Sequence, residues 1–200
     1  MDGKDGADPE LVEQFRQLFG YPDTHPADVL TAACHEAAHV VVAAAHGYLA
    51  TSVRLGIGAT EASGAMQVAL PEHFRRDTLA HRLRNRDARV VAAAVRDIRA
   101  VCSIYLASLA FYEVHCIGAK WSCLGDVLEA SAFLDLLPAE LEHDLRMWRL
   151  VDGLRPFFRR KDVEEAAFAL TAELLEHREV GAVEIWRACA GLLPATPRRA

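Results

Sequence analysis

The sequence lacks long hydrophobic runs. No strictly apolar stretch exceeds six residues, as at 40–45, whereas a helix that crosses a bilayer needs roughly 18 or more. The N-terminal residues MDGKDGADPEL are acidic and do not show the basic-then-apolar pattern of a secretory signal. We therefore expect a cytoplasmic protein without a membrane partner.

The sequence also lacks closely paired cysteines and an excess of positive charge. Its five cysteines contain no C-x-x-C pair, which argues against a disulfide scaffold and favours a reducing compartment. With 22 basic and 28 acidic residues the net charge is −6, so no nucleic-acid partner is expected. Six arginines at 75–89 have no aromatic residues among them and are interpreted as a solvated helix face.

The 200 residues, of which 52% are hydrophobic, are enough for a single domain with its own core. Apolar residues recur mostly at helical spacing, so we expect a mainly α fold with a small β-hairpin or sheet. The domain core should cover about residues 27–193, with flexible tails at 1–8 and 194–200. Helices are expected at 9–19, at 27–46, at 71–116 with a break near 85–87, and at 126–137, 140–151, 162–177 and 182–193.

Two short runs are typical of strands. Residues 51–57 alternate apolar with polar or small side chains, and residues 64–70 do so less regularly. The segment GIGATEASG between them is typical of a loop, so the pattern predicts a hairpin or a pair of edge strands. The second strand could receive an extended peptide by edge pairing, although an ordinary half-buried hairpin explains the pattern equally well.

The most informative segment is H-E-A-A-H at residues 35–39, which lies within an expected helix. Residues four apart lie on one face of a helix, so the imidazoles of His35 and His39 can reach one Zn²⁺ at about 2.0–2.1 Å. Glu36 can then lie beside a zinc-bound water as a general base. The motif therefore predicts a zinc site.

A zinc site of this kind needs a third protein ligand, and spacing alone leaves the choice open. His46 lies about 10.5 Å along the helix axis from His39, which is too far to share one ion. Glu61 falls in the expected loop, and Glu113 falls on an apolar helix. Asp126 begins a helix, where its local pattern favours an N-cap.

The segment TAACHEAAHVVVAAAHG resembles the peptidase domain of the FtsH family (M41 zinc peptidases), which carries H-E-A-G-H followed by small apolar residues. Later segments resemble that family in the same order. TSVRLGIG and SGAMQVALPE are similar to its strand pair, and VCSIYLASLAFYEVH to its buried helix with G-R-A-A-E-E. WSCLGDVLEASAFL is similar to its T-G-A-S-N-D-L-x-x-A-T segment, and the likeness covers roughly residues 27–150.

The resemblance implies a zincin-like helical peptidase domain in which Asp126, at the position of the family's aspartate ligand, joins His35 and His39. It implies Glu36 as the base and places Glu113 on a family glutamate position, where it would orient a ligand or pack polar groups. The chain also departs from the family. Alanine replaces the motif's glycine, the Gly-Arg of the buried helix is absent, and SCLG replaces T-G-A-S-N.

The expected function is hydrolysis of peptide bonds in a peptide or protein substrate by a zinc-activated water, with Glu36 moving the proton. No G-x-x-x-x-G-K-[ST] occurs, so this activity is expected to be independent of ATP in this chain. The alternatives are a metal-dependent hydrolase of a small amide and a non-catalytic zinc-binding regulatory protein. Assembly into a homo-oligomer is left open.

Four further side chains are considered around the expected zinc. Tyr112 and His115 are candidates for a second oxyanion donor, although a buried aromatic residue and a core histidine are the simpler interpretations. Cys123 is an alternative ligand. Inert buried thiols are the simpler interpretation for both Cys34 and Cys123.

Overall fold

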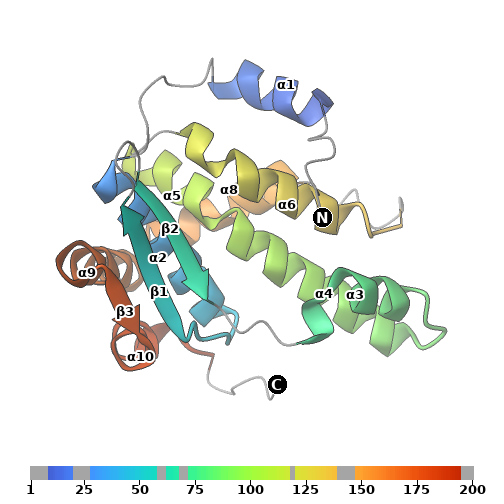
Figure 1. Cartoon of the computed structure of the whole chain (residues 1–200). Helices are drawn as coiled ribbons and strands as arrows, with labels where there is room; N and C mark the ends of the chain where they lie inside the picture. The colour runs from blue at the N-terminus through green and yellow to red at the C-terminus, as the bar shows by residue number, and fades with distance from the viewer. Residues whose placement is uncertain are drawn as a thin grey trace.

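The computed structural model describes residues 9–19, 28–57, 62–67, 72–117, 120–138 and 147–194. In these ranges the chain is mainly α-helical with a small antiparallel sheet, as the sequence predicted (Figure 1). None of the described helices is both long and apolar enough to cross a membrane. The α-helices are α1 (Pro9–Phe19), α2 (Val29–Ala45), α3 (Arg76–Leu83), α4 (Ala88–Tyr105), α5 (Ala107–His115), α6 (Leu124–Leu134), α8 (Met147–Phe158), α9 (Lys161–His177) and α10 (Ala182–Cys189).

The sheet has the strand order β2-β1-β3. Strand β1 (Ser52–Ile57) pairs antiparallel with β2 (Ala62–Gln67), and this confirms the predicted hairpin. The second strand begins two residues before the predicted one, and residues 68–70 lie outside the described part. Strand β3 (Glu179–Gly181) pairs with the other edge of β1 and was not predicted. A three-residue strand between two helices is too short to show an alternating pattern.

The helix predicted over 71–116 is in fact divided. A 3₁₀ turn, η1 (Glu72–Phe74), precedes α3, and the expected break near 85–87 separates α3 from α4. There the Asp87 carboxylate accepts a hydrogen bond from the Arg89 amide at 2.8 Å and caps α4. A second break, at Leu106, was not predicted and separates α4 from α5.

Other helix limits are corrected as well. Helix α6 begins at Leu124, after the 3₁₀ turn η2 (Lys120–Cys123), so Asp126 lies in its first turn and is not its N-cap. Helix α8 continues to Phe158, seven residues beyond the predicted end at 151. That helix was expected to begin at residue 140, but residues 139–146 lie outside the described part of the chain. Helices α1 and α9 confirm their predicted limits closely. Helix α10 begins as predicted but ends at Cys189, four residues before the predicted end, and the 3₁₀ turn η4 (Ala190–Leu192) follows it.

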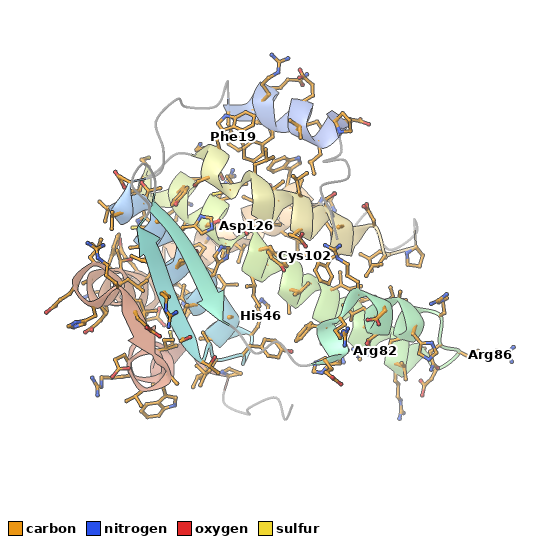
Figure 2. The ribbon with its side chains drawn as sticks, viewed as in Figure 1. Phe19, His46, Arg82, Arg86, Cys102 and Asp126 are labelled. Carbon is orange, nitrogen blue, oxygen red and sulfur yellow. The ribbon has the colours of Figure 1, made fainter. Side chains whose placement is uncertain are left out.

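The arginine-rich segment lies on the α3–α4 hairpin, which projects from the rest of the molecule (Figure 1). Of its six arginines, five are exposed, and Arg86 extends into solvent from the turn between the two helices (Figure 2). The sixth, Arg82, forms an ion pair with Asp97 of α4 at 2.8 Å, which ties the two helices together. The arginines of this segment are thus mostly exposed, and its interpretation as a solvated face stays a prediction.

Helix α2 lies at the centre of the fold. It packs against α9, α5, α4 and the sheet, and its side chains from Thr31 to Ala44 are buried except for the half-buried His35. The helix begins where the Asp28 carboxylate accepts a hydrogen bond from the Thr31 amide at 2.6 Å. It ends at Ala45, and Gly47 follows the His46 C-cap with a φ of 87°, a conformation that favours glycine. The motif-bearing helix is therefore held on all sides by the core.

We expect Asp28→Ala to lower the free energy of unfolding by about 1 kcal/mol, because it removes the side-chain acceptor at the start of α2. Asp28→Asn keeps an acceptor and should retain most of the stability. Chemical denaturation of the three proteins measures both effects. Equal losses in the two variants would contradict the assigned role of the cap.

Candidate metal centre

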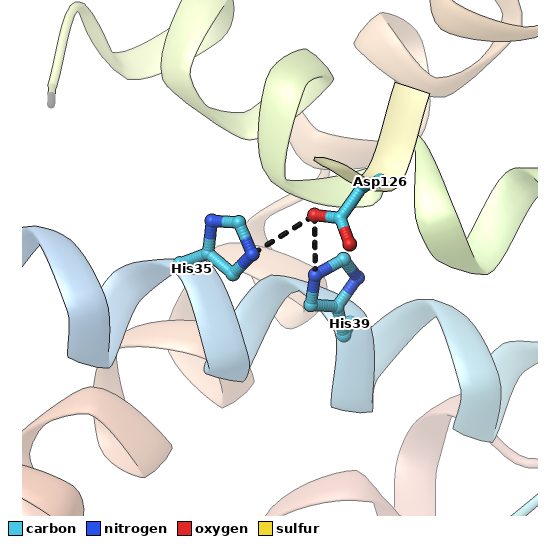
Figure 3. A group of neighbouring side chains, drawn as sticks. All are labelled: His35, His39 and Asp126. Atoms are coloured by element: carbon cyan, nitrogen blue, oxygen red, sulfur yellow. Dashed lines mark ion pairs between the residues drawn. The ribbon is translucent and has the colours of Figure 1, made fainter. Parts of the chain in front are cut away.

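Three side chains converge between α2 and α6. The Asp126 Oδ2 atom lies 2.9 Å from His35 Nε2 and 3.2 Å from His39 Nε2 (Figure 3). One ligand atom from each of the three residues lies within 4.8 Å of the other two. The histidines come from successive turns of α2, and the carboxylate comes from the first turn of α6. This group could hold a metal ion, as expected.

The donor atoms fit a small tetrahedral ion. For bonds of about 2.0–2.1 Å to nitrogen and oxygen, tetrahedral geometry separates ligand atoms by about 3.3 Å. The two measured oxygen–nitrogen separations fall close to that value. A slight increase in the separation of the three side chains would make room for an ion between them. Of the described residues, three form the group, and a zinc ion that acts in catalysis takes three protein ligands and keeps a fourth position for water.

A backbone carbonyl orients His39. Its Nδ1 atom lies 2.6 Å from the Ile104 carbonyl oxygen, and since a carbonyl only accepts, Nδ1 carries the proton. This hydrogen bond leaves Nε2 to face Asp126, as a metal ligand requires. Ile104 lies in the last turn of α4, where carbonyls lose their helical partners. The unpredicted break after α4 therefore contributes to the site.

Asp126 is positioned by α5 and by its own helix. The Ser108 hydroxyl donates a hydrogen bond to Asp126 Oδ2 at 3.3 Å, and Ser108 is fully buried in α5. Asp126 also lies in the first turn of α6, where the positive end of the helix dipole favours a carboxylate.

Sequence reasoning missed both Ile104 and Ser108. A backbone carbonyl leaves no trace in a sequence, but a serine within an apolar helical run could have signalled a buried polar contact.

Without a metal, the Asp126 carboxylate and the His39 imidazole stabilise each other's charged forms. Burial disfavours a charged His39, but the facing Asp126 carboxylate outweighs this effect and raises the pKa of His39 to about 9. Burial alone would raise the pKa of Asp126, yet His39 and His35 together hold it well below its usual range. The site thus attracts a cation, which is either a proton or a metal ion.

Glu36 lies next to this group and is 6% exposed. Burial raises the pKa of its carboxyl above the usual value, and the neighbouring His39 and His35 offset part of that rise. Glu36 makes no hydrogen bond or ion pair with any residue that the structure describes. Among the described residues its carboxylate is therefore not committed to an ion pair.

The structure places the other candidates around α5 in different surroundings. The buried Tyr112 hydroxyl donates to the Thr31 carbonyl at 2.8 Å, so it is already engaged within the core. Glu113 forms an ion pair with Arg155 of α8 at 2.7 Å. His115 lies against Phe111, with Nδ1 3.6 Å from a Glu164 oxygen. None of these three belongs to the metal-binding group.

The remaining alternatives for a ligand are also outside the group. His46 follows α2 at its C-terminal end, away from Asp126 (Figure 2). The fully buried Cys123 does not join the three ligands, and burial raises the pKa of its thiol to about 12. Cys34 is buried beside Thr171. Glu61 lies outside the described residues.

Comparison of the chain with protein-family models, with curated proteins and with solved structures finds no match.

We expect the purified chain to bind one Zn²⁺ ion. Replacing His39 or Asp126 by Ala should weaken binding by more than about 100-fold, because each removes a direct ligand and even supporting contacts contribute 10–100-fold. His46→Ala, on the same helix but outside the group, is the matched control and should bind normally. Calorimetric titration of the chelator-treated protein measures all four affinities. Unchanged affinity in Asp126→Ala would refute the assigned group.

The metal-free protein should lose stability as pH rises from about 6.5 to about 9. The pKa of His39 in the folded protein, about 9, exceeds the ordinary histidine value of 6.5. Its stabilising contribution is therefore complete below pH 6.5 and is lost as pH rises through 9. Asp126 stays ionised throughout this window because its pKa is lowered.

Urea unfolding in the presence of a chelator, at several pH values, measures this slope. His39→Gln should reduce it, whereas His177→Gln, at an exposed position on α9, should leave it unchanged. Identical slopes in the wild type and in His39→Gln would argue against the coupling of His39 to Asp126.

Proposed function

We propose that the chain is a zinc-dependent metallopeptidase of the FtsH-peptidase type. The observation that carries this proposal is the meeting of Asp126 with both histidines of the H-E-x-x-H helix. Two imidazoles and one carboxylate are a donor set that zinc takes in catalytic sites. The likeness of residues 27–150 to the FtsH peptidase domain had independently assigned the same aspartate.

The residues of the site supply the steps of hydrolysis. Bound Zn²⁺ would supply Lewis acidity, which polarises a substrate carbonyl and acidifies water. Glu36 takes the proton of the attacking water and returns it to the leaving amine. Its raised pKa suits this role, because a base titrating nearer neutral pH both accepts and returns the proton efficiently. The contact with Ile104 keeps the His39 ring oriented during this exchange.

A peptide or protein is the substrate that we favour. The support is the likeness to a peptidase family together with a hairpin whose β2 strand is at the edge of the sheet. Helix α2, which carries the motif, packs against β2. An extended peptide paired with that edge would lie along the side of the sheet that is next to the motif helix.

Glu36→Gln should lower kcat for an unstructured peptide by about 10²- to 10⁴-fold, the usual contribution of a general base. Because glutamine has the same shape, zinc affinity and thermal stability should stay close to those of the wild type. Glu129→Gln, at an exposed position on α6, is the matched control and should cleave normally. Cleavage of a quenched fluorescent peptide library, followed by mass spectrometry, gives the rates and the cut sites.

The same experiment separates the alternatives. Equal rates in the wild type and in Glu36→Gln would reject Glu36 as the base. Zinc binding without cleavage of any peptide, but with hydrolysis of small acyl amides, would replace the peptidase by an amidase. Stoichiometric zinc with neither activity would leave a non-catalytic zinc protein.

A further inference from the structure

A second cavity lies where the C-terminal end of α2 meets α4 and α8. Its volume is about 230 Å³, and none of its described lining residues belongs to the metal-binding group. Helix α4 separates the two sites. The Ile104 carbonyl of this helix contacts His39, whereas the preceding residue, Ser103, lines the cavity.

One side of the cavity is cationic. His46, Arg99 of α4 and Arg149 of α8 line it, and the described lining residues include no carboxylate. Arg99 is exposed and forms no ion pair with any residue that the structure describes. In a protein with a net charge of −6, a concave surface that is lined by the exposed Arg99 guanidinium, and by no acid among the described residues, favours an anionic ligand.

Ser103 adds a polar group to the wall of the cavity. This residue is only 6% exposed, and its hydroxyl makes no hydrogen bond to any described residue. The Ser103 Oγ atom is not one of the fully buried side-chain atoms without a partner, so it is accessible from the cavity that Ser103 lines. An oxygen atom of a bound anion would accept its proton.

The cavity also has an apolar part to its lining. Leu150, Leu154 and Phe157 lie on one face of α8 at helical spacing, and Val42 of α2 adds to the same lining. Gly153 leaves further room, because a Cβ atom there would meet nothing within 4 Å. A bare inorganic anion would leave this apolar surface unused, so the lining favours a ligand with a hydrocarbon body.

We propose that this cavity binds a small carboxylate with an apolar body. Its carboxylate faces Arg99, Arg149 and the Ser103 hydroxyl, and its hydrocarbon part packs against α8. The volume lies below the 300–1,000 Å³ of pockets for drug-sized ligands, so only a few carbon atoms fit. A free short-chain acid and the C-terminal residue of a peptide share this chemistry. The site requires neither the metal nor the proposed hydrolysis.

The test uses the full chain and measures binding by calorimetry. The probe is 4-methylpentanoate, and its neutral amide is the matched control ligand. The carboxylate should bind saturably, with a Kd of about 1 mM or lower, and the amide should bind about tenfold more weakly or worse, because it offers no charge to the guanidinium groups.

The protein variants probe the two sides of the cavity separately. Arg99→Gln should weaken binding of the carboxylate about tenfold, and Ser103→Ala should weaken it severalfold. Arg96→Gln, at an exposed position one turn earlier on α4, should bind as the wild type does. Gly153→Leu fills the open space at α8 without removing a charge and should block binding. Circular dichroism checks that each variant is folded.

Three results would overturn the proposal. They are no saturable binding of the carboxylate, equal affinity for the carboxylate and its amide, and tighter binding of inorganic phosphate. A short peptide ending in leucine, compared with its C-terminal amide, then identifies the source of the carboxylate. Binding of the peptide acid indicates a chain terminus, and binding of 4-methylpentanoate alone indicates a free acid.

Discussion

The contact of one carboxylate with two imidazoles governs the electrostatics of this molecule. Asp126 Oδ2 lies within 3.2 Å of both Nε2 atoms, and the three residues are largely removed from water. A carboxylate in such a place must be neutralised, because an unpaired buried charge costs several kcal/mol. The group is thus stable only with a cation, and this constraint connects the fold to metal binding.

The break at Leu106 positions two groups that support the contact of Asp126 with the histidines. Ile104, just before the break, orients His39 through its carbonyl, and Ser108, just after it, donates to Asp126. An uninterrupted helix would commit the Ile104 carbonyl to the amide of residue 108. With the break, that carbonyl is available to the imidazole. The interruption that divides α4 from α5 is therefore a functional part of the candidate site.

The sequence predicted those parts of the site that depend on local spacing. Positions 35 and 39 share a helix face because of helical periodicity alone, and the structure brings His35 and His39 together. Asp126 lies 87 residues beyond His39 in the chain, and no spacing rule connects them. Its local pattern favoured an N-cap, and only the likeness to the FtsH family assigned it as a ligand.

The difference between local sequence patterns and contacts distant in the chain also explains the errors in the predicted fold. Amphipathic helices such as α1 and α9 carry their own pattern, so their limits were predicted closely. The break at Leu106 lies between two apolar helical runs, and neither glycine nor proline marks it. Strand β3 exists because β1 has a free edge beside it. Both features are consequences of tertiary packing, which overrides local propensity.

Two glutamates near α2 and α5 show how surroundings assign roles to identical side chains. Glu113 meets the Arg155 guanidinium at 2.7 Å, a pairing that holds it as a structural anion between α5 and α8. Glu36 is buried without a guanidinium partner among the described residues, and burial raises its pKa. A proton-transfer group needs a pKa near the working pH and an uncommitted oxygen. Glu36 has no ion-pair partner among the described residues, its pKa is raised by burial, and it lies beside the three residues that could hold a metal ion, so its surroundings suit the proposed role.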